Sequence, residues 1–230
     1  MMAPPEDRPT LRPTLYAIRD LPYEMGPYRL TRKLPEGMAE VYEGVDLETP
    51  RPVAVKFLRH DMLMTDEARQ RFLQEIELAA NLDHSGVVPV LRSGTHEGVP
   101  YYAMPFIKGK RLDQYLEEDC PTLHDKLYVF LDLCRVVSAL HKRDWAHRDL
   151  KPGNILVDPY GTIRLLDFGL AKDTRALTQP DSRYAFLGTL GYMAPEQAGG
   201  DAEKAGPEAD VYAIGVLMYR ALTGEMPHAD

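Results

Sequence analysis

The pattern of hydrophobic positions changes partway along the chain. Residues 28–107 contain short runs rich in Val, Tyr and Phe, bounded by Gly, Pro and His, and such runs are typical of β-strands. The expected strands span residues 28–34, 40–45, 52–58, 87–93 and 101–107. A helix is expected at 66–82, where apolar residues recur at helical spacing: Phe72, Leu73, Ile76, Ala79 and Ala80. This half therefore predicts a mostly antiparallel sheet with one helix.

After about Gly109 the helical period dominates. Thr122 and Asp125 resemble a capping box that opens a long helix. The apolar face that we expect this helix to bury consists of Leu127, Phe130, Leu131, Cys134 and Val137. Residues 211–222 are apolar nearly all round, which predicts a helix buried on every side. A β-rich unit followed by a helical unit indicates two lobes with a cleft between them.

The first 27 residues differ from the rest of the chain. They hold six prolines, which cannot continue helices or central strands, so we expect a Pro-rich extended leader over 1–27. The folded domain is then expected at 28–230, with a first lobe at 28–107 and a second lobe at 108–230.

Composition narrows the classes of function. Of 230 residues, 27 are Lys or Arg and 35 are Asp or Glu, and the net charge of −8 argues against nucleic acid as a partner. The two cysteines, Cys120 and Cys134, lack the spacing of a zinc site or a disulfide scaffold. No apolar stretch is long enough to span a bilayer and no secretory signal is present, so we expect a cytoplasmic location.

Two charged side chains fall on positions that the pattern marks as buried. Glu75 lies on the apolar stripe of the helix at 66–82, and Lys56 ends the run Val53-Ala54-Val55. A buried charge needs a partner, so the two side chains could form an ion pair. Alternatively, both extend along apolar surface to reach solvent, and the residues alone leave this question open.

Groups able to carry chemistry are concentrated in one loop. Residues 147–154 include Asp149, Lys151 and Asn154 and precede a short strand, and Asp167 follows the next strand. Carboxylate and amide oxygens are hard ligands, so Asn154 and Asp167 at the ends of adjacent strands could share a divalent cation. Taken singly, each of the two is more often a turn residue than a metal ligand.

In order and spacing, these segments resemble the signature set of protein kinases. The segments are Val53-Ala54-Val55-Lys56, Glu75, the run from His147 to Asn154, Asp167-Phe168-Gly169, the run from Gly188 to Glu196, and the run from Asp210 to Gly215. From about residue 28 onward, the sequence in and around these motifs looks most like bacterial serine/threonine kinases of the eukaryotic type. The resemblance implies an α+β, bilobal fold with a small antiparallel β lobe that has one helix, and a mainly helical lobe that lacks its last helices.

The resemblance also implies the catalytic roles. ATP and Mg²⁺ are the expected cofactors, with Mn²⁺ as a possible substitute. Asp149 is expected to orient the substrate hydroxyl and accept its proton, and Lys151 to steady the transferred phosphoryl group. Asn154 and Asp167 are expected to bind the metal. Asp210 is expected to grip the backbone of the catalytic loop.

Further positions are expected to bind the nucleotide. The resemblance assigns Lys56 to the α- and β-phosphates and Glu75 to the support of Lys56, while Leu34 and Gly37 belong to the loop that covers the phosphates. The adenine pocket is expected to consist of Val41, Ala54 and Leu156 around the ring and Met104 behind it. The backbone carbonyl of Pro105 and the backbone amide of Ile107 are expected to recognise the edge of the base.

Regulation is expected to act through Arg148. In this family an arginine before the catalytic aspartate usually binds a phosphate on the segment at 167–196. Each candidate acceptor is, taken alone, explained equally well as a polar loop residue; the candidates are Thr174, Thr178 and Ser182. Thr189 is expected to contact the catalytic loop and so to favour hydroxyl substrates.

The covering loop departs from the family pattern. Pro35 and Ala39 stand in place of two glycines, and only Gly37 remains. Glycines there let backbone amides approach the phosphates, so nucleotide binding should be weakened. Two main functions remain: an ATP-dependent protein serine/threonine kinase activated by autophosphorylation, or a pseudokinase scaffold. A small-molecule phosphotransferase of the same fold is a more distant alternative.

The helix at 211–222 raises the question of partners. The chain stops soon after it, so we expect its apolar surface to be covered by a partner or by a further C-terminal segment. Protein substrates are the other expected partners.

Overall fold

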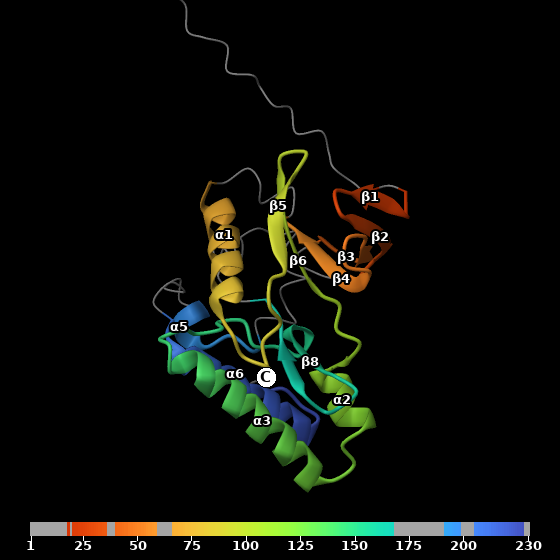
Figure 1. The fold of residues 1–230 in the computed structure, drawn as a ribbon. Coiled ribbons are helices and arrows are strands. Elements are labelled where there is room, and N and C mark those ends of the chain that lie inside the picture. Colours follow the sequence, from red (N-terminus) through yellow and green to blue (C-terminus); the bar gives the residue numbers. More distant parts are fainter. Residues whose placement is uncertain are drawn as a thin grey trace, which may run out of the picture.

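The computed structural model describes residues 18, 20–35, 40–58, 66–167, 191–198 and 205–227, apart from the side chains of residues 67, 68, 71, 75 and 78. Figure 1 shows two lobes, one built from a sheet and helix α1, the other mainly from helices α2, α3 and α6. This arrangement confirms the bilobal α+β fold.

The first lobe contains a six-stranded antiparallel sheet in the order β1-β2-β3-β4-β6-β5. Its strands are β1 (Tyr23–Met25), β2 (Tyr28–Lys33), β3 (Glu40–Asp46), β4 (Arg51–Phe57), β5 (Arg92–His96) and β6 (Val99–Pro105). Strands β2, β3, β4 and β6 lie where the sequence predicts strands. Strand β1 pairs with β2, so the sheet extends into the segment predicted to be a leader.

The strand predicted at 87–93 is wrong over most of its length. Strand β5 begins at Arg92, and Val87 and Val88, at the start of the predicted strand, contact the second lobe. Val87 forms an isolated bridge with Leu165, and the Val88 N–H donates to the Leu165 carbonyl at 3.0 Å. Both valines are buried. These β-branched residues are therefore explained by packing at the junction of the lobes rather than by a strand of the sheet.

Strand β4 contributes side chains to two separate cores. Val53, Val55 and Phe57 belong to one apolar cluster. Ala54 lies on the opposite face, in a cluster that includes Phe72 of α1 (Asp66–Asn81). Side chains alternate along a strand, so Lys56 shares the face of Ala54 and points toward the second cluster.

Helix α1 confirms the helix predicted at 66–82, with one change in its buried face. Phe72, Ile76 and Ala79 are buried as expected. Leu73 and Ala80, which were also expected to be buried, are exposed. Each follows a buried residue directly, and one residue of an α-helix turns the side chain by about 100°.

The second lobe combines helices with a small antiparallel sheet. Its helices are α2 (Leu112–Glu118), α3 (Leu123–His141), η2 (Pro152–Asn154), α5 (Pro195–Ala198) and α6 (Pro207–Thr223). Its strands are β7 (Lys110–Arg111), β8 (Ile155–Val157) and β9 (Ile163–Leu165), paired in that order. The predicted capping box is confirmed, because the Thr122 hydroxyl accepts the Asp125 N–H at 3.2 Å and the Asp125 carboxylate accepts the Thr122 N–H at 3.1 Å.

The predicted buried face of α3 is largely wrong. Phe130 and Val137 are buried, but Leu127, Leu131 and Cys134 are exposed. The rest of the buried face consists of Leu133, Val136 and Leu140. These residues pack in one cluster with residues of α6 and β9. Apolar residues occur on more than one side of α3, and contact with α6 and β9 decides which side is buried.

The sequence predicts that the helix at 211–222 is buried on every side. This prediction is wrong, because helix α6 is buried on one side only. Ala213, Val216 and Leu217 are buried. By contrast, Val211 is 63% exposed and Leu222 is 46% exposed. Within the described residues, no helix has the length and apolar character needed to cross a bilayer.

Candidate active site

Asp210 of α6 holds the start of the loop that contains the predicted catalytic residues. Asp210 is fully buried, and its two carboxylate oxygens accept the backbone N–H groups of His147 and Arg148, each at 2.7 Å. The Nε2 atom of His141, the last residue of α3, lies 2.8 Å from Asp210 Oδ2. Asp210 therefore grips the backbone of this loop, as the sequence predicts.

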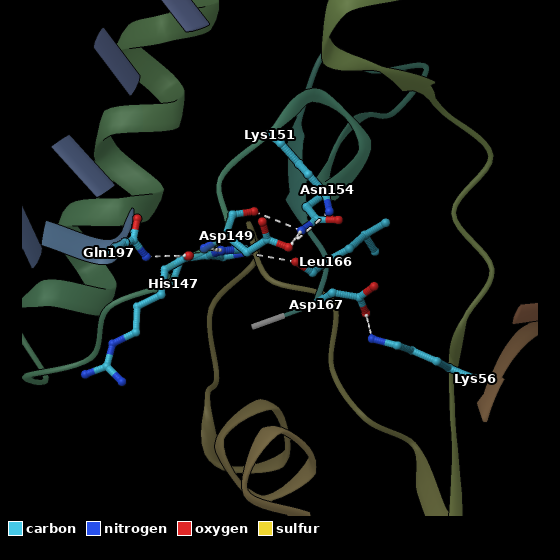
Figure 2. Close-up of polar contacts among 9 residues, drawn as sticks. Lys56, His147, Asp149, Lys151, Asn154, Leu166, Asp167 and Gln197 are labelled. Atoms are coloured by element: carbon cyan, nitrogen blue, oxygen red, sulfur yellow. Dashed lines mark hydrogen bonds and ion pairs between the residues drawn. The ribbon is translucent and has the colours of Figure 1, made fainter. Parts of the chain in front are cut away.

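Asp149, Lys151 and Asn154 converge in this loop (Figure 2). Asn154 Nδ2 donates to the backbone carbonyl and to the Oδ2 atom of Asp149, both at 2.8 Å. Lys151 Nζ lies 3.2 Å from the same Oδ2 atom. Two donors thus fix the carboxylate of Asp149, and fixed orientation is what a group needs to accept a proton from a bound hydroxyl.

A hairpin places Asn154 beside Asp167. Strands β8 and β9 pair with Ile155 opposite Leu165, and the Leu166 N–H donates to the Asn154 carbonyl at 2.9 Å. His147 Nε2 lies 2.8 Å from the Leu166 carbonyl and so ties the end of the hairpin to the catalytic loop. The Asn154 amide nitrogen donates to Asp149, so the hard ligands that this pair of residues offers are Asn154 Oδ1 and the Asp167 carboxylate. This donor set fits Mg²⁺, which commonly takes protein oxygens together with substrate phosphates.

Lys56 of β4 reaches across to Asp167 of the second lobe. Lys56 is buried, and its ion pair with Asp167 is drawn in Figure 2. The Nζ atom lies 2.8 Å from Asp167 Oδ1. The Tyr102 hydroxyl donates to the same oxygen at 2.9 Å. Burial alone would raise the pKa of Asp167, but the Lys56 ammonium and the Tyr102 hydroxyl hold that pKa below its usual range.

The partner predicted for Lys56 was Glu75. Glu75 belongs to α1, but its side chain lies outside the described part of the structure. The Lys56–Glu75 ion pair therefore stays a prediction, and the structure shows an ion pair between Lys56 and Asp167.

Most residues predicted to surround adenine lie in one apolar cluster. Its members include Leu34, Val41, Ala54, Met104 and Ile107. Ala54 and Met104 are opposite each other in the β4–β6 pairing, and the Leu34 N–H donates to the Val41 carbonyl at 2.8 Å. These contacts form one wall from strands that are separate in sequence.

Two other residues, Pro105 and Leu156, are predicted to contact adenine. The Phe106 N–H donates to the Pro52 carbonyl of β4 at 3.2 Å. The Pro105 carbonyl belongs to the same trans peptide group, in which C=O and N–H point in opposite directions, so it points away from β4. Leu156 lies on β8 opposite Arg164, and it is not among the side chains packed into the apolar cluster.

The regulatory predictions fall mostly outside the described residues. Those outside are Thr174, Thr178, Ser182 and Thr189, and Gly37 of the predicted phosphate-covering loop also lies outside. Arg148 is described, and its carbonyl accepts a hydrogen bond from Gln197 Nε2 at 3.0 Å. Its Nε atom is buried and has no hydrogen-bond partner among the described residues.

The structure adds residues that sequence reasoning missed. Tyr102 contacts Asp167, His141 contacts Asp210, and Gln197 contacts Arg148. The sequence placed Tyr102 in a predicted strand, which gave no sign of its contact with Asp167. That contact depends on the pairing of β6 with β4, and these two strands are not consecutive in the sequence. His141 and Gln197 act through tertiary contacts for which the sequence gives no local signal.

A cavity of about 320 Å³ lies in the second lobe beside η2. It is lined by residues of α2, α3 and α6 together with Pro152 and Tyr192. Tyr192 also lines a smaller pocket that contains Asp149. The larger cavity therefore lies close to the catalytic loop and carries charged groups on its wall, among them Glu117 and Arg220.

This fold and site belong to a known class. The family model of the protein kinase domain matches residues 28–230, and the chain is a member of that family. The serine/threonine-protein kinase PrkC of Bacillus subtilis is 35% identical over 206 residues, which cover 88% of this chain and 31% of the relative. The serine/threonine-protein kinase PknB of Mycobacterium leprae is 34% identical over 83% of this chain and 31% of its own length. The chain thus spans about a third of these curated relatives.

Solved structures agree with this assignment. The PknI kinase domain of Mycobacterium tuberculosis is 29% identical, with a TM-score of 0.68 over 90% of this chain and 76% of the solved chain. The apo form of PpkA-294 has a TM-score of 0.73 at 22% identity, over 90% of this chain and 79% of that chain, and supports the fold.

Proposed function

We propose that the chain carries an ATP-dependent protein serine/threonine kinase activity. One observation carries this proposal: Asn154 and Lys151 both engage the Asp149 carboxylate, while the adjoining hairpin presents Asp167 to Lys56 of the other lobe. The names of the curated relatives, all serine/threonine-protein kinases, support the choice of hydroxyl substrates.

Asp149 would orient the substrate hydroxyl and accept its proton, because its carboxylate is already held by two donors. Lys151 would stabilise negative charge on the transferred phosphoryl group. Asn154 and Asp167 would hold Mg²⁺, or Mn²⁺ in its place, and the bound metal would neutralise charge on the phosphates. Lys56 would contact the α- and β-phosphates.

The apolar wall that includes Val41, Ala54 and Met104 would receive adenine. The Pro105 carbonyl and the Ile107 amide would read its edge, and Leu156 would close the pocket from the second lobe. Leu34 and Gly37 would contribute to the loop over the phosphates, and Glu75 would support Lys56.

Autophosphorylation would regulate this activity. The buried Arg148 Nε atom lacks a partner among the described residues, and a phosphate on Thr174, Thr178 or Ser182 would supply one. Thr189 would contact the catalytic loop and favour hydroxyl acceptors.

The same proposal includes the partners and the location of the protein. Protein substrates would be its partners, and the cytoplasm its location. The exposed apolar side of α6, which includes Val211 and Leu222, would be covered by a partner or by a further segment of chain.

The test is transfer of radiolabelled phosphate from ATP with Mg²⁺, in the chain and in its Asp149→Asn variant. Asp132→Asn is the control, because Asp132 lies on α3 outside the loop and forms an exposed ion pair with Arg135. We expect label in the chain and in the control, on Thr174, Thr178 or Ser182, and none in Asp149→Asn.

The alternative is a pseudokinase scaffold, which Pro35 and Ala39 in the covering loop favour. Binding of a fluorescent ATP analogue separates the two. A folded chain that neither transfers label nor binds the analogue would overturn the kinase proposal.

A further inference from the structure

Tyr102 occupies the centre of β6, directly opposite Lys56 of β4. It is 3% exposed and lies in the same cluster as Ala54 and Met104. Its backbone position therefore places its side chain on the face of the sheet that carries the proposed nucleotide site.

The two ends of the Tyr102 side chain contact different charged groups. Its hydroxyl donates to Asp167 Oδ1 at 2.9 Å, and Lys56 Nζ lies 2.8 Å from that same oxygen. The Lys56 ammonium is also 5.5 Å from the centre of the Tyr102 ring, within the range of a cation–π contact. Tyr102 thus contacts both members of the ion pair that joins the lobes.

The ring of Tyr102 is itself fixed by packing. Phe72 of α1 lies against it, with ring centres 5.5 Å apart. Strand β6, helix α1 and Lys56 together limit the positions that the hydroxyl can reach. The hydrogen bond to Asp167 is therefore made from a preorganised donor in the β lobe to an acceptor in the helical lobe.

We propose that Tyr102 is a positioning residue for Asp167, and this inference rests on the proposed kinase function. By engaging Oδ1 together with Lys56, the hydroxyl sets the rotation of the carboxylate and presents Oδ2 toward the metal. A tyrosine that served only to fill the core would use its ring, which Phe shares, and would not need its hydroxyl.

The experiment compares Tyr102→Phe with Tyr101→Phe. The first change keeps the ring, its packing against Phe72 and its contact with Lys56, and removes only the hydroxyl that binds Asp167. Tyr101 is the next residue on β6 and packs in the other core, against Phe57, so its variant controls for loss of a buried phenol.

Two quantities are measured in each protein: the Mg²⁺ concentration for half-maximal phosphate transfer, and the affinity for a fluorescent ATP analogue with and without Mg²⁺. For Tyr102→Phe we expect the Mg²⁺ concentration for half-maximal phosphate transfer to rise about tenfold. We also expect Mg²⁺ to strengthen binding of the ATP analogue about tenfold less than it does in the unchanged chain, a difference of about 1.4 kcal/mol. Affinity without Mg²⁺ should stay within about twofold of the unchanged chain, and Tyr101→Phe should match that chain in every measurement.

Unchanged Mg²⁺ dependence in Tyr102→Phe would overturn the inference while leaving the kinase proposal intact. An equal loss of affinity with and without Mg²⁺ would also overturn it, because that pattern indicates a packing role. If the unchanged chain shows neither transfer nor Mg²⁺-dependent nucleotide binding, the kinase proposal fails, and this inference fails with it.

Discussion

Asp210 accepts the backbone N–H of Arg148 at 2.7 Å, although 62 positions separate the two residues in sequence. Arg148 has a φ angle of 63°, a left-handed conformation that costs free energy for a residue with a side chain. The hydrogen bonds that Asp210 accepts from the N–H groups of Arg148 and His147 compensate for this cost. The geometry of the catalytic loop therefore depends on a buried carboxylate in a helix far along the chain.

Replacing Asp210 should destabilise the protein strongly. Asp210→Ala leaves the buried His147 N–H, the part-buried Arg148 N–H and His141 without their acceptor, and one unsatisfied buried donor typically costs about 1 to 3 kcal/mol. Urea unfolding measures the change in free energy. The control is Asp132→Ala, which removes an exposed ion pair worth less than about 1 kcal/mol. Similar unfolding midpoints for the two variants would contradict this role of Asp210.

The hairpin that carries Asn154 and Asp167 should become less stable at low pH, because the Asp158 carboxylate becomes protonated there. The Asp158 carboxylate accepts the N–H groups of Tyr160 and Thr162 and pairs with Arg164. Burial would raise the pKa of Asp158, but these hydrogen bonds and the Arg164 charge hold it below its usual value. A carboxyl with a lowered pKa stabilises the fold above its unfolded pKa of about 4, and this stabilisation is lost as the pH falls through the folded pKa.

The test is the free energy of unfolding of Asp158→Asn and of the unchanged chain at several pH values. At pH 7 the variant should be less stable by about 1 kcal/mol, because it loses the charge that pairs with Arg164. The difference should shrink below about pH 4. Asp83→Asn, at an exposed position, is the control. A difference that stays constant down to low pH would contradict the assignment to ionised Asp158.

Local sequence predicted that polar groups gather in the loop at 147–154, and the structure brings Asp149, Lys151 and Asn154 together there. His147 to Asn154 are contiguous, and a short hairpin from β8 to β9 brings Asp167 back to Asn154. A hairpin needs only local pairing, so strand ends that are close in sequence are close in space. The proximity of Asn154 and Asp167 thus follows from neighbours along the chain, whereas the roles proposed for them and for Asp149 come from the family resemblance.

Contacts between distant segments were not predictable in the same way. Tyr102 reaches Asp167 because β6 pairs with β4, and that pairing skips α1 and β5. Val87 and Val88 have strand-like side chains, yet they bridge the lobes. In both cases the partner is chosen by tertiary packing, which residue propensities do not encode.

Gly109 at the junction of the lobes should not tolerate a side chain. A Cβ atom there would lie 2.6 Å from the backbone carbonyl oxygen of Val157, so the pairing of β7 with β8 would have to shift. We expect Gly109→Ala to lower the free energy of unfolding by about 1 to 3 kcal/mol. Gly215→Ala is the matched control, since a Cβ atom on that α6 glycine meets no atom within 4 Å. Helix propensity should raise stability by about 0.5 to 1 kcal/mol in the control, and the same sign of change in both variants would contradict the steric argument.

The buried face of α3 can be tested with two leucines that are two positions apart. Leu133 is fully buried among residues of the second-lobe core, whereas Leu131 is 45% exposed. Leu133→Ala should lower the free energy of unfolding by about 2 to 5 kcal/mol, since it removes buried methyl groups and leaves a cavity. Leu131→Ala should change it by less than about 1 kcal/mol, because much of that side chain is in water in both states and Ala favours a helix. Urea unfolding of both variants gives the comparison. A larger loss from Leu131→Ala than from Leu133→Ala would mean that the face predicted from the sequence, with Leu127 and Cys134, is the buried one after all.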